Sequence, residues 1–407
     1  MNRAFPTRRA LRALQPQEGS RAAAWLQSPT TLLVALVAMS RLLAVEIGAL
    51  AFRFFTHAWV QTVPGYLLPP AGYWSQSLLG VWAHWDGFWY LSIATIGYTG
   101  RAVATAFFPL YPLLVRLLGG TDVSGILVSL ACFAAGTWLV YLIARRELGH
   151  DVAWYTVLAL AFFPSSFFFT AVYPEALVLL LSAGCIYLLL QHRIGWAALL
   201  AGVASAASVD GVLLGLPVLL TLWQERRPWR EWLSLLLVPL GVLTYMGYLA
   251  LAFGDPLTFQ GAQAHWGRSF APPWTTIWIA LRDFLQRIPQ IGWPHLFATG
   301  EPLVVLSNTW NLVFALLGLL LLYLSIRRLR PALWSYALAV LIVPFFYPSN
   351  GVPLMSAPRF LLSAWPIFLA AGLFLVEHPR WTRPALWASI ACGAFFVALF
   401  ATAHWVA

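Results

Sequence analysis

Long apolar stretches alternate with short polar breaks along most of this chain. A helix that crosses a bilayer needs about 20 apolar residues. The pattern therefore predicts an all-α polytopic membrane protein with about eleven transmembrane helices. The predicted spans cover roughly residues 30–52, 125–144, 152–170, 174–190, two short stretches within 195–223, then 232–253, 302–325, 333–347, a stretch beginning near 358, and 385–406.

The apolar run from Gly195 to Trp223 is predicted to turn back on itself at Asp210-Gly211, a dipeptide typical of turns. As one span it would place the arginines at 226, 227 and 230 outside, against the usual excess of positive charge in cytoplasmic loops. Two short helices keep those arginines inside. Helices of this kind are tolerated in a membrane where they line a cavity.

The placement of arginines also predicts the topology of the whole chain. Residues 1–29 are expected to be a cytoplasmic basic tail, and residues 30–407 a single integral-membrane domain. Two long loops, at about 53–104 and 254–301, are expected on the extracytoplasmic side. The chain is therefore predicted to be a multi-pass protein of the cell membrane with a cytoplasmic N-terminus and an extracytoplasmic functional site.

Charge is scarce in this sequence, since 61% of its residues are hydrophobic and 9% are charged. Ordinary soluble domains contain about 25% charged residues, so that class is excluded. We assign the net charge of +10 to loop arginines that orient the protein, not to nucleic-acid binding. Within the first span, Arg41 and Glu46 are expected to form a buried structural pair, because opposite charges inside a span usually face the protein interior.

One carboxylate, Asp86, lies among aromatic residues in the sequence His84-Trp85-Asp86-Gly87-Phe88-Trp89-Tyr90. An isolated acid next to membrane spans is energetically costly unless it has a use, which favours a functional site. The alternative is structural, with the Asp as the cap of an interfacial helix and the Trp and Tyr residues as a membrane belt.

Two further charged residues lie at predicted external ends of spans. Glu175 follows a proline-broken tip at residues 163–174 and begins the returning helix, where an acid also stabilises the helix N-terminus electrostatically. Arg359 begins a later span on the side from which most basic residues are absent. It is expected either to bind a substrate phosphate or to reach a lipid phosphate.

A family resemblance rests mainly on three motifs in the first predicted loop and just after it. They read Trp-Asp-x-x-x-Tyr at residues 85–90, Ile-Ala-x-x-Gly-Tyr at 93–98 and Phe-Phe-Pro-Leu-Tyr-Pro at 107–112. They resemble the bacterial relatives of GPI mannosyltransferase II, the PIG-V family, which are integral-membrane glycosyltransferases of the GT-C fold. The resemblance is weaker at residues 163–175, 254–268 and Arg359. Relatives often have an Arg near the position at which this chain has Asp210, so the chain departs from the family pattern there.

The resemblance implies transfer of mannose, with inversion, from a polyprenyl-phosphate donor to an acceptor hydroxyl, with Asp86 as the general base. Arg359 and Arg268 are the candidates for binding the donor phosphate. The acceptor is a glycolipid, a polysaccharide or a protein hydroxyl. The expected substrate pocket contains His84, Trp85, Tyr90, Glu175, His265 and Trp266.

No cofactor is expected, since a cation can stabilise the leaving phosphate without a metal. The external acids leave a divalent cation open as an alternative. A different class of function also stays open, namely a transporter or flippase of lipid-linked intermediates that uses charges such as Arg41, Glu46 and Asp210 along a pathway. The absence of a detectable internal repeat and the two long loops favour the enzyme.

Overall fold

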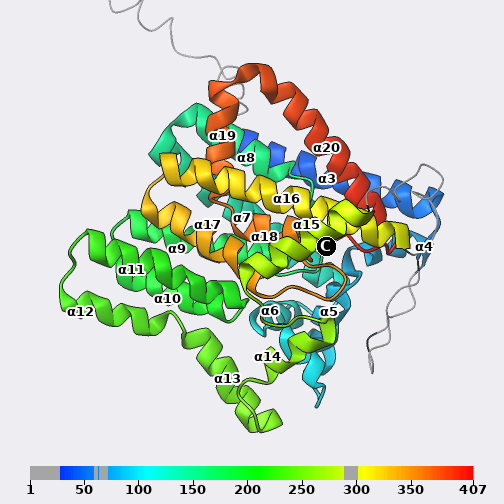
Figure 1. Cartoon of the computed structure of the whole chain (residues 1–407), viewed down its shortest axis with the longest axis horizontal. Coiled ribbons are helices and arrows are strands. Elements are labelled where there is room, and N and C mark those ends of the chain that lie inside the picture. The colour runs from blue at the N-terminus through cyan, green and yellow to red at the C-terminus, as the bar shows by residue number, and fades with distance from the viewer. Residues whose placement is uncertain (1–27, 59–62, 64–71, 288–300, 407) are drawn as a thin grey trace, which may run out of the picture.

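The computed structural model describes residues 28–58, 63, 72–287 and 301–406, which form helices joined by turns (Figure 1). Nearly all of the basic tail predicted at 1–29 lies outside the described residues, as do residues 288–300 of the second predicted loop and parts of the first. Within the described residues the β pairing is limited to isolated bridges, such as that between Arg268 and Ser349. The predicted all-α architecture is confirmed.

The centre of the molecule consists of three helices, of which the first packs against the other two. They are α7 (Asp122–Leu148), α8 (His150–Ala161) and α9 (Glu175–Leu190). The contact between α7 and α9 is close because α7 has a glycine there: a Cβ on Gly136 would lie 3.2 Å from the backbone nitrogen of Leu180. Around this centre, α19 (Ile367–Glu377) packs on α8, and α10 (Ile194–Ser205) packs on α9, while α20 (Pro379–Ala401) lies along α3 (Pro29–Phe54).

Four helices among the described residues are long and apolar enough to cross a membrane: α3, α7, the part Leu306–Arg328 of α16 (Glu301–Arg328), and α20. The number rises to six if two bent pairs each count as one span. One pair is Trp229–Leu237 with α13 (Leu240–Phe253), and the other is α18 (Ala357–Ser363) with α19. Four shorter apolar helices, Glu175–Leu190, Ile194–Ser205, Val209–Gln224 and Pro331–Phe346, fall on four more of the predicted spans. The predicted span 152–170 is helical only as far as Ala161, where α8 ends.

The hairpin predicted within residues 195–223 is present. The helix α10 ends at Ser205, a 3₁₀ helix η4 (Val209–Leu214) makes the turn, and α11 (Gly215–Gln224) returns. The turn packs directly on the end of α10, because a Cβ on Gly211 would lie 2.2 Å from the carbonyl carbon of Ala204. A side chain at position 211 has no room, so the glycine of the Asp-Gly pair is a packing requirement as well as a turn signal.

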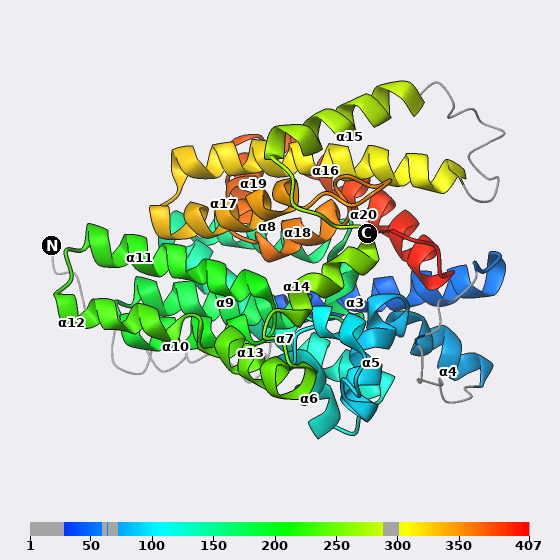
Figure 2. The same cartoon turned by 60° about the horizontal axis from the view of Figure 1, so that its bottom comes forward.

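The elements of the two predicted external loops gather at one end of the bundle. The first loop supplies α4 (Tyr73–Leu78) and α5 (Asp86–Ile96), and α6 (Leu110–Leu117) packs on α5. The second loop supplies α14 (Thr258–Ala262), the 3₁₀ helix η6 (Gln263–Trp266) and α15 (Pro273–Arg287). Figure 2 shows α5, α6, α13 and α14 together at this end, below α18.

The predicted pair of Arg41 and Glu46 is wrong. Arg41 is buried, but its guanidinium donates to the carbonyl oxygens of Ala161 and Ser166 and to the hydroxyl of Ser166. Glu46 lies on an exposed part of α3. The chain after α8 is broken at Pro164, which leaves carbonyl groups without helical partners, and Arg41 satisfies them.

Candidate functional site

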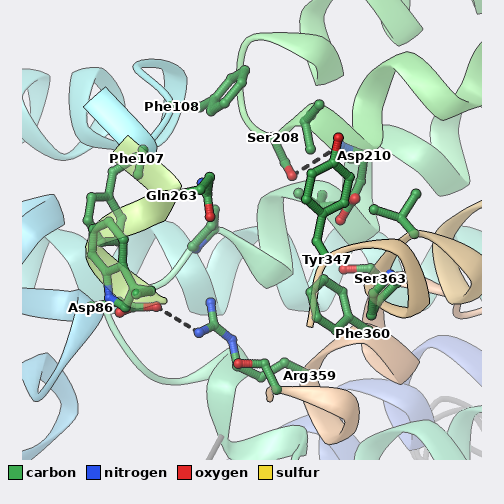
Figure 3. Close-up of a pocket in the computed structure, with 18 of the residues that line it drawn as sticks. Asp86, Phe107, Phe108, Ser208, Asp210, Gln263, Tyr347, Arg359, Phe360 and Ser363 are labelled. Atoms are coloured by element: carbon green, nitrogen blue, oxygen red, sulfur yellow. Dashed lines mark hydrogen bonds and ion pairs between the residues drawn. The ribbon is translucent and has the colours of Figure 1, made fainter. Parts of the chain in front are cut away.

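A cavity of about 380 Å³ lies where the two loops predicted to be external meet the ends of α9, α17 (Pro331–Phe346) and α18 (Figure 3). Its charged lining residues are Asp86, Glu175, Asp210, Arg268 and Arg359. Its lining also includes aromatic, amide and hydroxyl side chains, among them Tyr90, Phe107, Phe108, Ser208, Gln260, Gln263, Trp266, Tyr347, Phe360, Ser363 and Trp405. Apart from the motif at 93–98, each sequence segment that carried the family resemblance contributes residues to this one cavity.

Asp86 is held at the cavity wall by a strained turn. The preceding residue, Trp85, has φ 57° and ψ −118°, a backbone conformation that non-glycine residues rarely adopt. Such strain persists only where the surroundings enforce it, and it is commonest at functional sites. Two contacts enforce it here: the Trp85 ring packs edge-on against Trp405 at 5.1 Å, and the Asp86 N–H donates to the Tyr173 hydroxyl at 3.1 Å.

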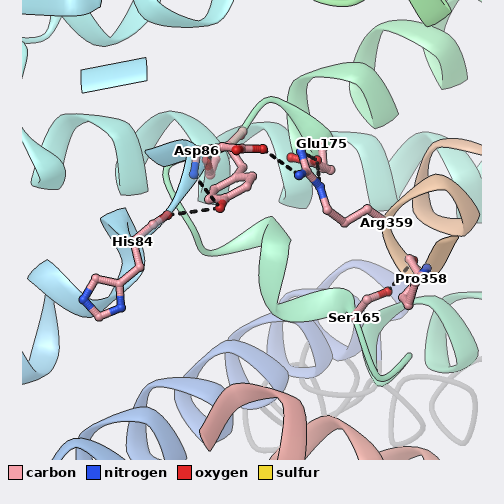
Figure 4. A network of polar contacts seen from close by, with 8 residues as sticks. His84, Asp86, Ser165, Glu175, Pro358 and Arg359 are labelled. Atoms are coloured by element: carbon pink, nitrogen blue, oxygen red, sulfur yellow. Dashed lines mark hydrogen bonds and ion pairs between the residues drawn. The ribbon is translucent and has the colours of Figure 1, made fainter. Parts of the chain in front are cut away.

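The helix-cap interpretation of Asp86 does not fit the geometry. Asp86 is the first residue of α5, and no side chain caps this helix by a hydrogen bond. Its carboxylate oxygen Oδ2 instead accepts from Nη1 of Arg359 at 2.7 Å, across 273 residues of sequence (Figure 4). Among the described residues the second oxygen, Oδ1, has no hydrogen-bond partner. Asp86 is thus an oriented carboxylate with one oxygen left for a ligand.

Arg359 joins two carboxylates. Besides its contact with Asp86, its Nε donates to Oε1 of Glu175 at 2.8 Å, and its Nη2 forms an ion pair with the same oxygen at 2.7 Å. Its guanidinium also lies over the rings of Tyr173 and Phe168, at 4.9 and 5.1 Å from their centroids. Cation–π contacts of this kind add to the stability of a desolvated cation. The side chains of Arg359 and Asp86 are each 16% exposed, so this is a nearly buried ion-pair network.

The start of α18, which carries Arg359, is fixed from two sides. The Ser165 hydroxyl donates to the carbonyl oxygen of Pro358 at 2.7 Å (Figure 4). The Ala357 N–H donates to the side-chain oxygen of Asn311 at 3.1 Å. The proline-broken tip after α8 therefore holds the residue next to Arg359.

Glu175 is 6% exposed and begins α9, as predicted. Its oxygen Oε1 is paired with Arg359, but its buried oxygen Oε2 has no partner among the described residues. A buried polar atom without a partner costs about 1–3 kcal/mol, so such atoms mark places where a ligand or water binds. Glu175 therefore does more than stabilise a helix N-terminus.

Arg268 differs from Arg359 because it makes no ion pair in the part of the chain that the structure describes. Its guanidinium lies 5.9 Å from the ring centroid of Phe360. Its backbone is held by a bridge to Ser349, whose hydroxyl donates to the carbonyl oxygen of Trp266 at 2.6 Å. Burial lowers the pKa of Arg268 to about 10, which still leaves the side chain fully protonated at neutral pH. It is a cation available to an anionic ligand.

The other residues of the expected pocket divide into two groups. Tyr90 and Trp266 line the cavity together with Glu175, whereas His84, Trp85 and His265 are not among its lining residues. His84 is 3% exposed, its Nδ1 lies 2.9 Å from the Phe400 carbonyl oxygen, and burial lowers its pKa, so its ring is packed in the interior beside Phe400. His265 lies in an exposed position of η6.

Sequence reasoning missed Tyr173 as a site residue. Its hydroxyl donates to the His84 carbonyl oxygen at 3.0 Å and accepts the Asp86 N–H, so it bridges the strained turn. It lies two residues before Glu175, where the family pattern Tyr-x-Glu could have identified it. Within the described residues no group of three or more His, Cys, Asp or Glu side chains is placed to hold a metal ion.

Comparisons with known proteins give the same picture over part of the chain. Residues 106–249 match the family described as dolichyl-phosphate-mannose-protein mannosyltransferase. Over 115 residues the chain is 34% identical to GPI mannosyltransferase 2 of Drosophila pseudoobscura pseudoobscura. The chain resembles mannosyltransferases. The match spans 25% of this chain and 25% of the relative's length, and it confirms the resemblance inferred from the first loop.

Solved structures of similar arrangement are two crystal structures of ArnT from Cupriavidus metallidurans. The first, bound to undecaprenyl phosphate, has a TM-score of 0.47 at 13% identity and covers 92% of this chain and 77% of that one. The second, in the apo state, has a TM-score of 0.43 at 16% identity over 94% of this chain and 76% of that one. The mannosyltransferase-like segment 106–249 contains Glu175 and Asp210, and the cavity adds Asp86, Arg268 and Arg359 from outside it.

Proposed function

We propose that this protein is a membrane glycosyltransferase that moves a hexose, mannose in view of its relatives, from a polyprenyl-phosphate donor to an acceptor hydroxyl. The observation that carries the proposal is the orientation of Asp86. A strained turn and Arg359 hold its carboxylate at a cavity that also contains Arg268, a cation without an ion pair among the described residues. A proton acceptor and a free cation facing one cavity are what transfer from a phosphate leaving group requires.

The proposed reaction is a single displacement with inversion. The acceptor oxygen attacks the anomeric carbon, and Asp86 takes the hydroxyl proton as that bond forms. The bond between the anomeric carbon and the phosphate oxygen breaks on the opposite face, and the phosphate leaves with the electron pair. Arg268 stabilises the charge that develops on the phosphate. No cofactor is part of this proposal, because the arginine supplies the positive charge.

The contacts of the two arginines favour Arg268 over Arg359 as the phosphate ligand. Arg359 already donates to Asp86 and Glu175, so a phosphate could bind it only by displacing a carboxylate. Arg268 has no such partner in the described chain. Arg359 is therefore proposed as a positioning residue that orients Asp86.

The expected location is the extracytoplasmic side of the cell membrane, with the lipid donor entering from the bilayer. A glycolipid, a polysaccharide or a protein hydroxyl is the proposed acceptor. Single cysteines at Pro228 and His265, in a chain whose own cysteines are replaced by Ala, test the orientation. A membrane-impermeant reagent should label position 265 in intact cells and leave 228 unlabelled, and the opposite pattern would reverse the orientation.

The activity itself is tested with purified protein in lipid vesicles and a polyprenyl-phosphate donor labelled in its sugar. If the protein is the proposed transferase, a new product that carries the labelled sugar should form, together with free polyprenyl phosphate. If the protein is a flippase, the donor should cross the bilayer with its sugar–phosphate bond intact. Movement of the intact donor without any transfer to a panel of acceptors would favour the flippase and reject the proposed reaction.

A further inference from the structure

Asp210 is a cavity residue to which the reaction proposed above gives no role. It is 7% exposed and lies in the turn η4, and its side chain faces the same cavity as Asp86. Figure 3 shows it on the opposite side of the cavity from Asp86, with Tyr347 beside it and Gln263 between them. Relatives with an Arg near this position would present the opposite charge there.

The turn that carries Asp210 is rigid. Its backbone N–H donates to the hydroxyl of Ser208 at 3.2 Å, and the next residue, Gly211, packs against the backbone of α10 without room for a Cβ. The carboxylate is therefore kept in the cavity wall by the backbone. It is not drawn there by a partner, because Asp210 makes no ion pair within the described residues, whereas Asp86 and Glu175 share Arg359.

A nearly buried carboxylate without a charge partner requires hydrogen-bond donors. Burial, together with the nearby charge of Glu175, raises the pKa of Asp210 to about 6, although a hydrogen bond with Ser208 and the charges of Arg359 and Arg268 act in the opposite direction. The unpartnered oxygen Oε2 of Glu175 is a second acceptor in the same cavity. Ser208, Gln263 and Tyr347 add groups that both donate and accept.

This combination matches a sugar better than it matches a phosphate. Phosphate oxygens are acceptors and carry negative charge, so a carboxylate repels them. Sugar hydroxyls donate to carboxylates and exchange hydrogen bonds with amide and hydroxyl groups. We infer that Asp210 forms a subsite that binds hydroxyl groups of the donor sugar, with Oε2 of Glu175 as a second acceptor. This inference rests on the proposed function, and it assigns Asp210 to recognition of the hexose.

The test measures binding of three kinds of lipid to the full-length protein in vesicles. They are polyprenyl-phosphate mannose, a set of the same donors that each lack one sugar hydroxyl, and polyprenyl phosphate without sugar. The variants are Asp210→Ala, Asp210→Asn, and Asp151→Ala as a control that removes an exposed acid from α8. Transfer is measured in the same samples, so that binding and turnover are read separately.

The wild type and Asp151→Ala should bind at least one deoxy donor more weakly than the complete donor, by roughly 10- to 100-fold. Asp210→Ala should bind that deoxy donor and the complete donor with equal affinity. Asp210→Asn keeps one acceptor oxygen, so its ratio of the two affinities should lie between those of the wild type and Asp210→Ala. Binding of the sugar-free lipid should be the same in all of them, which also shows that the variants are folded.

The inference would be overturned if Asp210→Ala lowered the affinity for every donor by the same factor. Weaker binding of the sugar-free lipid by Asp210→Ala would overturn it as well. A wild type that does not distinguish the sugar-bearing lipid from the bare one would also overturn it. Failure of the proposed function has a different signature, because the wild type would then bind the donors with the expected discrimination but transfer no sugar.

Discussion

The cavity has two differently built sides. On one side, Asp86 and Glu175 share Arg359, and Tyr173 ties the network to the strained turn at Trp85. On the other side, Asp210 and Arg268 face the cavity without ion pairs in the described chain. The charges of the first side are paired with one another, and only Oδ1 of Asp86 and Oε2 of Glu175 are left for a ligand there. The charges of the second side have no ion-pair partner among the described residues.

This difference assigns different tasks to chemically similar residues. Charges that are already paired and fixed are suited to orient a reacting group, because they need no rearrangement when the substrate arrives. Charges without partners gain most from a ligand, because binding then satisfies groups that are costly to bury. Substitutions on the paired side should therefore affect stability and rate, and substitutions on the unpaired side should affect ligand affinity.

The largest effect on stability is expected for Arg359→Ala. Removing the shared cation leaves the carboxylates of Asp86 and Glu175 nearly buried and unpaired, which typically costs about 3–5 kcal/mol. Arg359→Lys should retain part of the stability that Arg359→Ala loses, because an ammonium keeps the charge but loses the forked geometry. Thermal unfolding in detergent measures both. Equal stability of the wild type and Arg359→Ala would show that the network does not hold this side of the cavity together.

Arg268→Ala should act on affinity with little change in unfolding temperature. A charge-assisted hydrogen bond to a phosphate is worth roughly 1.5–3 kcal/mol, so affinity for polyprenyl phosphate should fall about tenfold or more. Arg268→Lys should fall less. Titration of the protein with the sugar-free lipid measures the affinity for the polyprenyl phosphate alone. If Arg268→Ala binds the lipid normally while Arg359→Lys does not, the phosphate lies on the paired side and the comparison is reversed.

Tyr173→Phe should have the smallest of these effects. It removes a hydroxyl that accepts the Asp86 N–H and donates to the His84 carbonyl, which costs about 1–3 kcal/mol when the remaining groups stay buried. Turnover should fall while lipid affinity stays constant, since Asp86 loses part of its orientation. Steady-state kinetics that determine kcat and KM separately check this expectation. A change in KM alone would place Tyr173 on the binding side.

The fold could be predicted from the sequence because each helix carries its own apolar signal. The turn at Asp210-Gly211, the broken tip before Glu175 and the start of the span at Pro358 all lie where the sequence pattern predicts them. The pairing of Arg41 was wrong because residue spacing along one helix does not show which carbonyl groups a neighbouring break leaves free.

The site could be predicted only in part. Asp86, Glu175, Arg268 and Arg359 were identified individually, but their pairing joins residues up to 273 positions apart and depends on tertiary packing. A sequence also gives no indication that a Trp adopts a positive φ, so the strained turn before Asp86 could not be foreseen. His84 and His265 have the right chemistry for a pocket, but tertiary packing places both outside the cavity lining.

The most direct test of the account is the turnover of Asp86→Asn at saturating donor. Asn keeps the size of Asp and one acceptor oxygen but cannot take a proton at neutral pH. Loss of a general base lowers the rate by about 10²–10⁴, so transfer should fall by that factor while the protein still binds polyprenyl phosphate. Asn and Asp cap helices about equally well, so a structural Asp would tolerate the change. Near-normal turnover of Asp86→Asn, with donor binding intact, would contradict the assignment of Asp86 as the base.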